Sequence, residues 1–317
     1  MTQQEFGDPH RLAGAAVVVG VDGSAESDTT VRWAAKLAAQ RGRELHIVHG
    51  LDLTGMGKVP RIYQAVVPQV VESVRADGTA LLRHAEQVAR ALEPRPRVTV
   101  HLSEDGGTAL LLERSATAYA VVMGATGTAG TVAHLGSTLL TVTSHARGPV
   151  VVVRPDPEAG NTVHESGPVV VGVDGSPISE AALAAAFAEA AERRTTLIAV
   201  HVWSDWSFGR YAGADAPLSI EELDDIEDAI LAERLAGWQE KYPDVDVVRR
   251  LYFSDPVKHL TEWSRHAHLT EWSRHAQLLV VGTRGRGGLV GMLLLGSTSH
   301  SLVQHAHCPV LVVHPAR

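Results

Sequence analysis

The chain has 317 residues, of which 45% are apolar and 20% charged, and its formal net charge is −8. Such a chain can bury two sizeable cores, while its negative charge argues against a nucleic-acid partner, which requires a basic surface. No apolar run approaches the roughly 18 residues that span a bilayer, the single Cys308 cannot form an internal disulfide, and the N-terminus lacks a signal-peptide pattern, so we expect a cytoplasmic protein with no membrane partner.

The chain contains a tandem duplication. The octapeptide VVVGVDGS occurs at Val17–Ser24 and again at Val169–Ser176, and His49 recurs as His201 at the same offset. The ending HARGPVVVVRP of the first half recurs as HAHCPVLVVHP in the second. Solenoid repeats run only about 20–50 residues, so a repeat of this length indicates two complete domains.

Domain boundaries follow from the register of this duplication. We predict a first domain at 1–155 and a second at 168–317. The segment between them, 156–167, contains the proline, glycine and asparagine typical of a linker.

Strands and helices alternate along each half. Strands are predicted where β-branched residues run without polar alternation, and helices where apolar residues recur at helical spacing. In chain order the first half is predicted to contain strand 15–21, helix 24–41, strand 45–49, helix 69–92, strand 98–102, helix 108–118, strand 120–123, helix 137–145 and strand 150–153. The second half repeats this order, with Ser176 as N-cap before Pro177 and a capping box from Ser219 to Glu222. The alternation predicts an α/β fold with a parallel sheet and helices on both faces.

The acidic run Glu221–Asp228 permits two interpretations. Acids in the first turns of a helix complement its dipole and face solvent, whereas a cluster of acids can also bind a metal ion or a basic partner. We favour solvated acids.

Glycine loops follow the fourth strand of each half. In the second half the predicted strand 278–281 runs into Gly282–Gly288, and Gly296 then precedes a helix. Glycines let a ligand approach the backbone, and a helix N-terminus offers unpaired N–H groups, so the loop is a candidate phosphate site. It is neither a Walker A loop nor a dinucleotide fingerprint, because no lysine precedes the Ser/Thr and the glycines do not follow the first strand. A purely structural turn is the alternative.

Together these motifs resemble the universal stress protein family in its tandem two-domain form. The shared features are VVVGVDGS on the first strand, a G-x-x-G loop, G-[ST] opening a helix, and a terminal HAxxPVxVV strand. The resemblance implies two Rossmann-like domains, each a five-stranded parallel sheet flanked by helices. ATP-binding members of the family hold adenosine near the first and second strands and the phosphates in the glycine loop.

The resemblance also implies which residues would bind the nucleotide. In the first half these are Gly20, Asp22, Gly124, Ala125, Thr126, Gly127, Thr128, Ala129, Gly130, Ser137 and Thr138. In the second half they are Gly172, Asp174, Asp205, Gly282, Thr283, Arg284, Gly285, Arg286, Gly287, Gly288, Gly296, Ser297 and Thr298. Serine and threonine hydroxyls would reach phosphate oxygens or a bound Mg²⁺. For the two aspartates before glycine, closure of a turn through their own backbone is the alternative.

The two loops depart from the family pattern and from each other. The ATP-binding pattern places nine residues between G-x-x-G and G-[ST], whereas eight separate Gly127 from Gly136 and ten separate Gly285 from Gly296. Only the second loop carries arginines, Arg284 and Arg286, whose guanidinium groups can pair with phosphate oxygens. We therefore predict tighter binding in the second half, with solvent-facing arginines as the alternative.

A perfect nine-residue repeat, HLTEWSRHA, occupies His259–Ala267 and again His268–Ala276. Nine residues are about two and a half helical turns, so the leucine and tryptophan of one copy point roughly opposite to those of the other. One copy is therefore expected to be displaced from the core. A metal site built from the histidines is the alternative to a simple local duplication.

These observations predict an ATP-binding regulator of the stress response or of growth, with Mg²⁺ as a possible companion of the nucleotide and a homodimer as the expected assembly. We assign no catalytic and no resident metal-ligating residue, because no Ser/His/Asp or Cys/His arrangement is tied to the loops. Two alternatives stay open: slow ATP hydrolysis or phosphotransfer, and a dimeric scaffold that binds no nucleotide.

Overall fold

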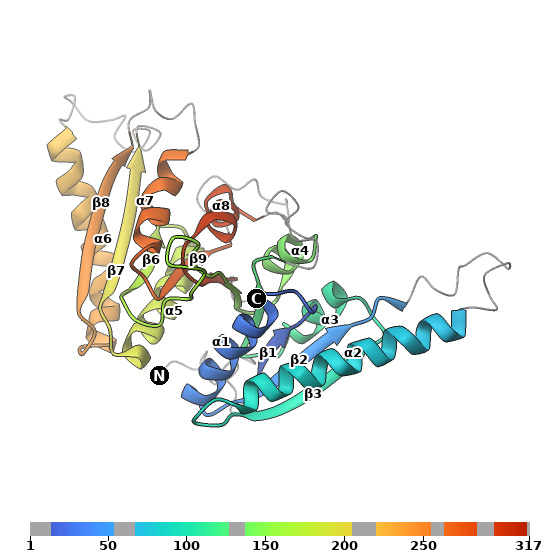
Figure 1. Ribbon diagram of the computed structural model, residues 1–317. Coiled ribbons are helices and arrows are strands. Elements are labelled where there is room, and N and C mark those ends of the chain that lie inside the picture. The colour runs from blue at the N-terminus through green and yellow to red at the C-terminus, as the bar shows by residue number, and fades with distance from the viewer. Residues whose placement is uncertain are drawn as a thin grey trace. The chain divides into compact units, whose positions relative to one another are not determined.

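The computed structural model describes residues 14–53, 67–126, 137–204, 220–254, 263–283 and 295–315. The chain divides into two compact units, Met1–Val153 and Arg154–Arg317, whose helices and strands are labelled in Figure 1. The segment predicted as a linker, 156–167, falls in the second unit by this division, and its limits stay a prediction.

The first unit is a parallel sheet with helices between successive strands. Its elements are β1 (Val17–Gly20), α1 (Ser27–Gln40), β2 (Glu44–Gly50), α2 (Val67–Arg90), β3 (Arg97–Ser103), α3 (Gly107–Arg114), β4 (Ala120–Gly124), α4 (Ser137–His145) and β5 (Val150–Val153). The described strands pair in parallel in the order β3-β2-β1-β4-β5, with Val17 opposite both Leu45 and Ala120.

The second unit repeats this architecture. Its elements are β6 (Val169–Val173), α5 (Pro177–Arg193), β7 (Leu197–Ser204), α6 (Ile220–Lys241), β8 (Val247–Ser254), α7 (Trp263–Ser273), β9 (Leu278–Gly282), α8 (Ser297–His305) and β10 (Val310–Val313). Its described strands pair in parallel in the order β8-β7-β6-β9-β10. The predicted α/β fold with two tandem domains is confirmed.

The core of each unit lies between the central strands and two helix layers. Strands β1, β4, β5 and β10 bury every valine, which explains why their sequences lack polar alternation. Helix α1 packs beside α2 and α3 beside α4, and the second unit repeats these pairs as α5 with α6 and α7 with α8. Burial of an aliphatic side chain contributes roughly 1.5–3 kcal/mol, so these strands supply much of the driving force for folding.

The predicted start of α5 is confirmed. The Ser176 side chain accepts a hydrogen bond from the Ser179 amide at 3.2 Å, and Pro177 occupies the first helical turn. A hydroxyl at this position satisfies one of the amides that a helix N-terminus leaves unpaired. The capping box predicted from Ser219 lies outside the described residues, although α6 begins at Ile220.

The second copy of the nine-residue repeat packs into the core. Leu269, on α7, is only 4% exposed and its Cδ1 lies 3.2 Å from the position that a side chain at Gly172 would take. Ala276 is fully buried, and the indole of Trp272 donates a hydrogen bond to the Tyr252 hydroxyl at 2.9 Å. The side chains of the first copy lie outside the described residues. The second copy is therefore packed, and the expected displacement of one copy stays a prediction.

Deleting one copy of the repeat is expected to leave a folded protein. Because the copies are identical, removal of His259–Ala267 and removal of His268–Ala276 produce the same polypeptide, and the remaining copy can fill the packed position. We expect a loss of about 1 kcal/mol, which corresponds to roughly 2–4 °C in melting temperature. Differential scanning calorimetry checks this, and an insoluble variant would show that both copies are needed.

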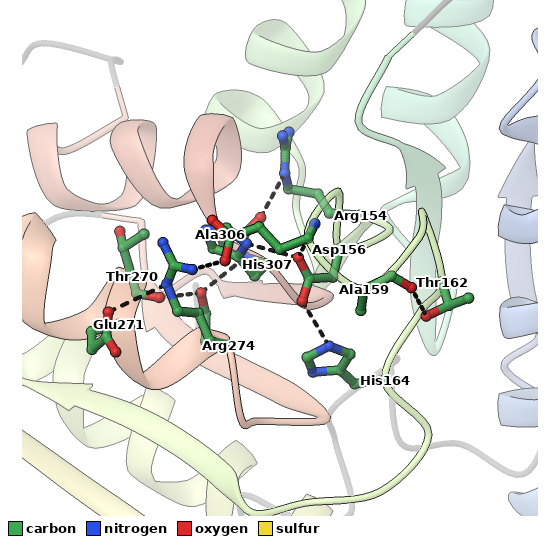
Figure 2. Close-up of polar contacts among 12 residues, drawn as sticks. Arg154, Asp156, Ala159, Thr162, His164, Thr270, Glu271, Arg274, Ala306 and His307 are labelled. Atoms are coloured by element: carbon green, nitrogen blue, oxygen red, sulfur yellow. Dashed lines mark hydrogen bonds and ion pairs between the residues drawn. The ribbon is translucent and has the colours of Figure 1, made fainter.

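A buried carboxylate holds the start of the second unit in place. Asp156 accepts hydrogen bonds from His307 Nδ1 at 2.9 Å, from His164 Nε2 at 3.0 Å and from the Glu158 amide at 2.9 Å, as Figure 2 shows for the two histidines. Burial alone would raise the pKa of Asp156, but the hydrogen bonds from His307, the Glu158 amide and His164 outweigh it, and the pKa is lowered. Arg154, just before this cluster, donates to the Ala306 carbonyl oxygen at 2.9 Å.

Replacing Asp156 with asparagine is expected to lower the free energy of unfolding of the second unit by roughly 1.5–3 kcal/mol at pH 7, the range for hydrogen bonds to a charged group. Because folding lowers the pKa of Asp156, its contribution is complete above the pKa of an unfolded aspartate, about 3.9, and is lost as the pH falls through the folded pKa. The difference between the two proteins should therefore shrink as the pH falls below about 4.

Urea unfolding followed by tryptophan fluorescence measures this difference. Trp33 belongs to the first unit and every other tryptophan to the second, so the signal reports mainly on the second unit. A difference that persists unchanged at pH 3 would contradict the assignment of the effect to the Asp156 carboxylate.

Candidate functional site

Each unit reverses its direction of winding at one pair of neighbouring strands. In the first unit β2 and β3 lie on one side of β1, whereas β4 and β5 lie on the other; β6 and β9 form the corresponding pair in the second unit. In open α/β sheets, ligands bind outside the carboxyl ends of the strands at such a switch point. The predicted glycine loops begin at this edge, directly after β4 and β9.

In the second unit the two ends of the glycine loop meet. The Thr283 amide donates to the Val313 carbonyl oxygen at 2.9 Å, and the Gly296 amide donates to the Thr283 carbonyl oxygen at 2.7 Å. The Ser299 hydroxyl donates to the carbonyl oxygen of Gly282. The structure thus brings together five of the predicted residues, which are Gly282, Thr283, Gly296, Ser297 and Thr298. Arg284, Gly285, Arg286, Gly287 and Gly288 lie outside the described residues.

The N-terminus of α8 lies at this edge, and no side chain caps it. Gly296 is the N-cap residue and has an extended backbone, with φ −61° and ψ 151°. Ser297 is exposed and Thr298 is half-buried. A helix start of this kind leaves amide donors and a partial positive charge for an anion.

Thr283 carries a buried hydroxyl at the base of the loop. The residue is 3% exposed, and its Oγ1 has no hydrogen-bond partner within the described part of the chain. A buried polar atom without a partner costs about 1–3 kcal/mol, so native structures retain one mainly where a ligand, a water or a functional role accounts for it.

The first unit builds the same edge with different groups. The Ala125 amide donates to the Val153 carbonyl oxygen at 3.1 Å, so Ala125 occupies the position that Thr283 has in the second unit. The Thr126 amide donates to the Glu26 carboxylate at 3.2 Å. Thr138, near the start of α4, exchanges a hydrogen bond with the Thr108 hydroxyl at 2.8 Å. Ser137 begins α4, whereas Gly127, Thr128, Ala129 and Gly130 lie outside the described residues.

The two predicted aspartates close turns. Asp22 Oδ1 accepts from the Ser24 amide at 3.0 Å and Asp174 Oδ1 accepts from the Ser176 amide at 2.9 Å. Each precedes a glycine in the left-handed region, Gly23 at φ +79° or Gly175 at φ +76°. The structure therefore shows the turn-closing arrangement at both positions, while a role in nucleotide binding stays a prediction. Asp205 lies outside the described residues.

Glycines at or near the end of the first strand of each unit, Gly20 and Gly172, make room for leucines. A side chain at Gly20 would lie 3.0 Å from Leu111 Cδ1, and one at Gly172 would lie 3.2 Å from Leu269 Cδ1. Both leucines come from helices packed on the sheet, α3 and α7. These contacts give the two glycines a packing role, and their contact with a ligand stays a prediction.

One buried pair near this edge was missed by the sequence analysis. His201 Nδ1 donates to the Val173 carbonyl oxygen at 2.7 Å, and its Nε2 lies 3.1 Å from Glu227 Oε2. Glu227 is 0% exposed, so the expectation that the whole acidic run faces solvent is wrong at this residue. The recurrence of His49 as His201 was the available signal, because His49 makes the same bond to the Val21 carbonyl oxygen at 2.7 Å.

Cys308 is a buried residue of the core. Burial raises the pKa of its thiol far above the ordinary value, which keeps the sulfur protonated and unreactive.

Comparison with known proteins places this architecture in a family. The model of the universal stress protein family matches residues 15–154 and again residues 166–314. The chain belongs to the universal stress protein family. It is the tandem form, with one family domain in each half.

Related universal stress proteins share this length. One from Mycolicibacterium smegmatis is 39% identical over 307 residues, covering 94% of this chain and 97% of that protein. One from Mycobacterium tuberculosis is 38% identical over 301 residues, covering 93% and 96%. A universal stress protein structure from Archaeoglobus fulgidus has a TM-score of 0.56 at 19% identity and covers 95% of this chain and 96% of that one, which supports the fold.

None of the helices described in this universal stress protein is long and apolar enough to cross a membrane.

Proposed function

We propose that this universal stress protein binds ATP at the carboxyl edge of the second unit and acts as a regulator through that binding. The observation that carries the proposal is the buried Thr283 hydroxyl, which lacks a partner among the described residues and lies where the two ends of the glycine loop meet. A bound nucleotide supplies the hydrogen-bond partner that this hydroxyl lacks.

Charge and geometry at the same edge favour a phosphorylated ligand. The uncapped N-terminus of α8 offers amide donors and a partial positive charge. Arg284 and Arg286 in the same loop add guanidinium donors that pair with phosphate oxygens. The resemblance of the loops to those of ATP-binding family members favours an adenine nucleotide among such ligands.

The donor set fits a magnesium ion that arrives with ATP. In the parts of the chain that the structure describes, no three His, Cys, Asp or Glu side chains gather to hold a metal. Mg²⁺ typically keeps several waters and is bound through substrate phosphates with few protein ligands, a role that the hydroxyls of Ser297 and Thr298 suit. We also propose that the protein is cytoplasmic and assembles as a homodimer.

Replacing Thr283 with valine is expected to have opposite effects on stability and on binding. Valine matches the shape of threonine and removes the buried polar atom, so the free energy of unfolding of the ligand-free protein should rise by about 1 kcal/mol. The affinity for Mg·ATP should fall about tenfold, because the nucleotide loses a hydrogen bond worth roughly 1.5 kcal/mol. Urea unfolding and isothermal titration calorimetry measure the two effects.

Thr143→Val is the matched control. Thr143 is also buried, but its hydroxyl donates to the Leu139 carbonyl oxygen at 2.7 Å. This variant should lose stability and keep the wild-type affinity for Mg·ATP. The proposal is overturned if the wild-type protein releases no heat and shows no thermal shift with saturating Mg·ATP.

A further inference from the structure

Glu26 places a negative charge on the glycine loop of the first unit. Its Oε2 accepts a hydrogen bond from the Thr126 amide at 3.2 Å and lies 3.9 Å from the position that a side chain at Gly124 would occupy. Glu26 immediately precedes α1 and does not cap that helix with its side chain. The carboxylate thus lies over the start of the loop and takes up one of its amide donors.

The second unit has no carboxylate at this position. By the register of the duplicated octapeptide, Ile178 corresponds to Glu26. The apolar side chain of Ile178 packs on the start of the loop, since its Cγ2 lies near the position that a side chain at Gly282 would take. The buried Thr283 hydroxyl of the second unit likewise has no counterpart in the first, where Ala125 stands.

We propose that Glu26 acts as an internal anion that closes the first loop to phosphate, so that the chain binds one nucleotide, in the second unit. This inference rests on the proposed function, because it concerns the same kind of site in the other half. It assigns Glu26 as the residue that determines which unit binds.

Two physical effects of the Glu26 carboxylate disfavour phosphate binding at the first loop. A phosphate at the first loop must compete with the carboxylate for the Thr126 amide, because that hydrogen bond already satisfies the donor. The carboxylate also repels a phosphate held within several ångströms, and this repulsion is weakly screened in a half-buried site. In the second unit the apolar Ile178 contributes neither effect.

Titration of the full chain with Mg·ATP tests the inference, with isothermal titration calorimetry reporting both affinity and stoichiometry. We expect about one nucleotide per wild-type chain. Glu26→Gln keeps the shape and removes the charge, and Glu26→Ile reproduces the second unit; both should make a second site measurable, with an affinity at least tenfold above that of the wild-type first unit. Ile178→Glu, the reciprocal change, should weaken the wild-type site at least tenfold.

Glu44→Gln is the matched control, because Glu44 is a partly exposed glutamate on β2 whose carboxylate contacts His46 and Arg97. It should leave the titration unchanged. Failure of the two proposals is distinguishable: a wild-type chain that binds no nucleotide overturns the proposed function. A chain that binds one nucleotide before and after the Glu26 substitutions overturns this inference alone, as does weaker binding by Glu26→Gln, which would make the carboxylate part of the site.

Discussion

Replacing His201 with alanine is expected to destabilise the second unit by about 3–5 kcal/mol, the loss typical of breaking a buried pair from one side. His201 is 5% exposed and Glu227 is 0% exposed, and the two contact each other at 3.1 Å. The imidazole also binds the Val173 carbonyl oxygen, one residue before the turn that carries Asp174. Alanine removes both contacts and leaves the buried Glu227 without this partner.

His49→Ala in the first unit is the matched control. His49 makes the same bond to a strand-end carbonyl at 2.7 Å, but it is only partly buried, and the helix position beside its ring is Gly78. The control should lose about 1 kcal/mol, the value of one hydrogen bond. Hydrogen exchange measured by mass spectrometry follows each unit separately. Equal losses in the two variants would show that Glu227 adds nothing to the histidine's contribution.

The central strands and several helix ends could be predicted because their signals are local. The run Val150–Val153 and the helix Ser137–His145 have the predicted bounds, and Ser176 caps α5 as predicted. In each case the deciding residues lie within a few positions of one another. The parallel direction of the strands likewise follows from their alternation with helices.

The pairs that join distant segments could not be predicted in this way. Glu227 is one acid within an acidic run, so composition does not distinguish it from the other acids of the run. Only the fold brings it to His201, which lies 26 residues earlier. Asp156 was placed in a linker on composition, although it contacts His307, which is 151 residues away. Such contacts depend on which helix face meets the sheet, and a single sequence does not specify that face.

The sequence predicted which loops form the candidate site, but it did not predict the polar contacts within them. The sequence places Gly282 and Gly296 in one loop, and the structure shows that loop closed through Thr283. The contact of Glu26 with the other loop depends on a carboxylate 100 residues before Thr126. The octapeptides that are identical in the two halves end two residues before Glu26 and Ile178. The difference between the halves therefore lies just outside the repeated motif.

Replacing Gly50 with alanine is expected to destabilise the first unit by about 3 kcal/mol or more, at the upper end of the range for an overpacked site. An added methyl carbon would lie 2.5 Å from the Gly107 amide nitrogen, 2.6 Å from the Asp105 carbonyl oxygen and 2.8 Å from the Gly106 carbonyl carbon. All three are backbone atoms at the start of α3, so no side-chain rotation relieves the contact. Either the end of β2 or the start of α3 must move, although both are fixed in the packed unit.

Gly107→Ala is the control for this prediction, because it adds the same methyl group to the residue whose amide nitrogen faces Gly50. No atom lies within 4 Å of the added carbon there, and alanine favours a helix by up to about 1 kcal/mol over glycine, so this variant should be neutral or slightly stabilised. Hydrogen exchange of the amides in β1, β2 and β4 measures both variants against the wild type. If Gly50→Ala protects these amides as well as Gly107→Ala does, the close approach of β2 to α3 does not constrain the first unit. A loss confined to Gly50→Ala would establish that the backbone at the start of α3 requires a glycine at the end of β2. This requirement is specific to the first unit, because the second unit carries Val202 at the corresponding position.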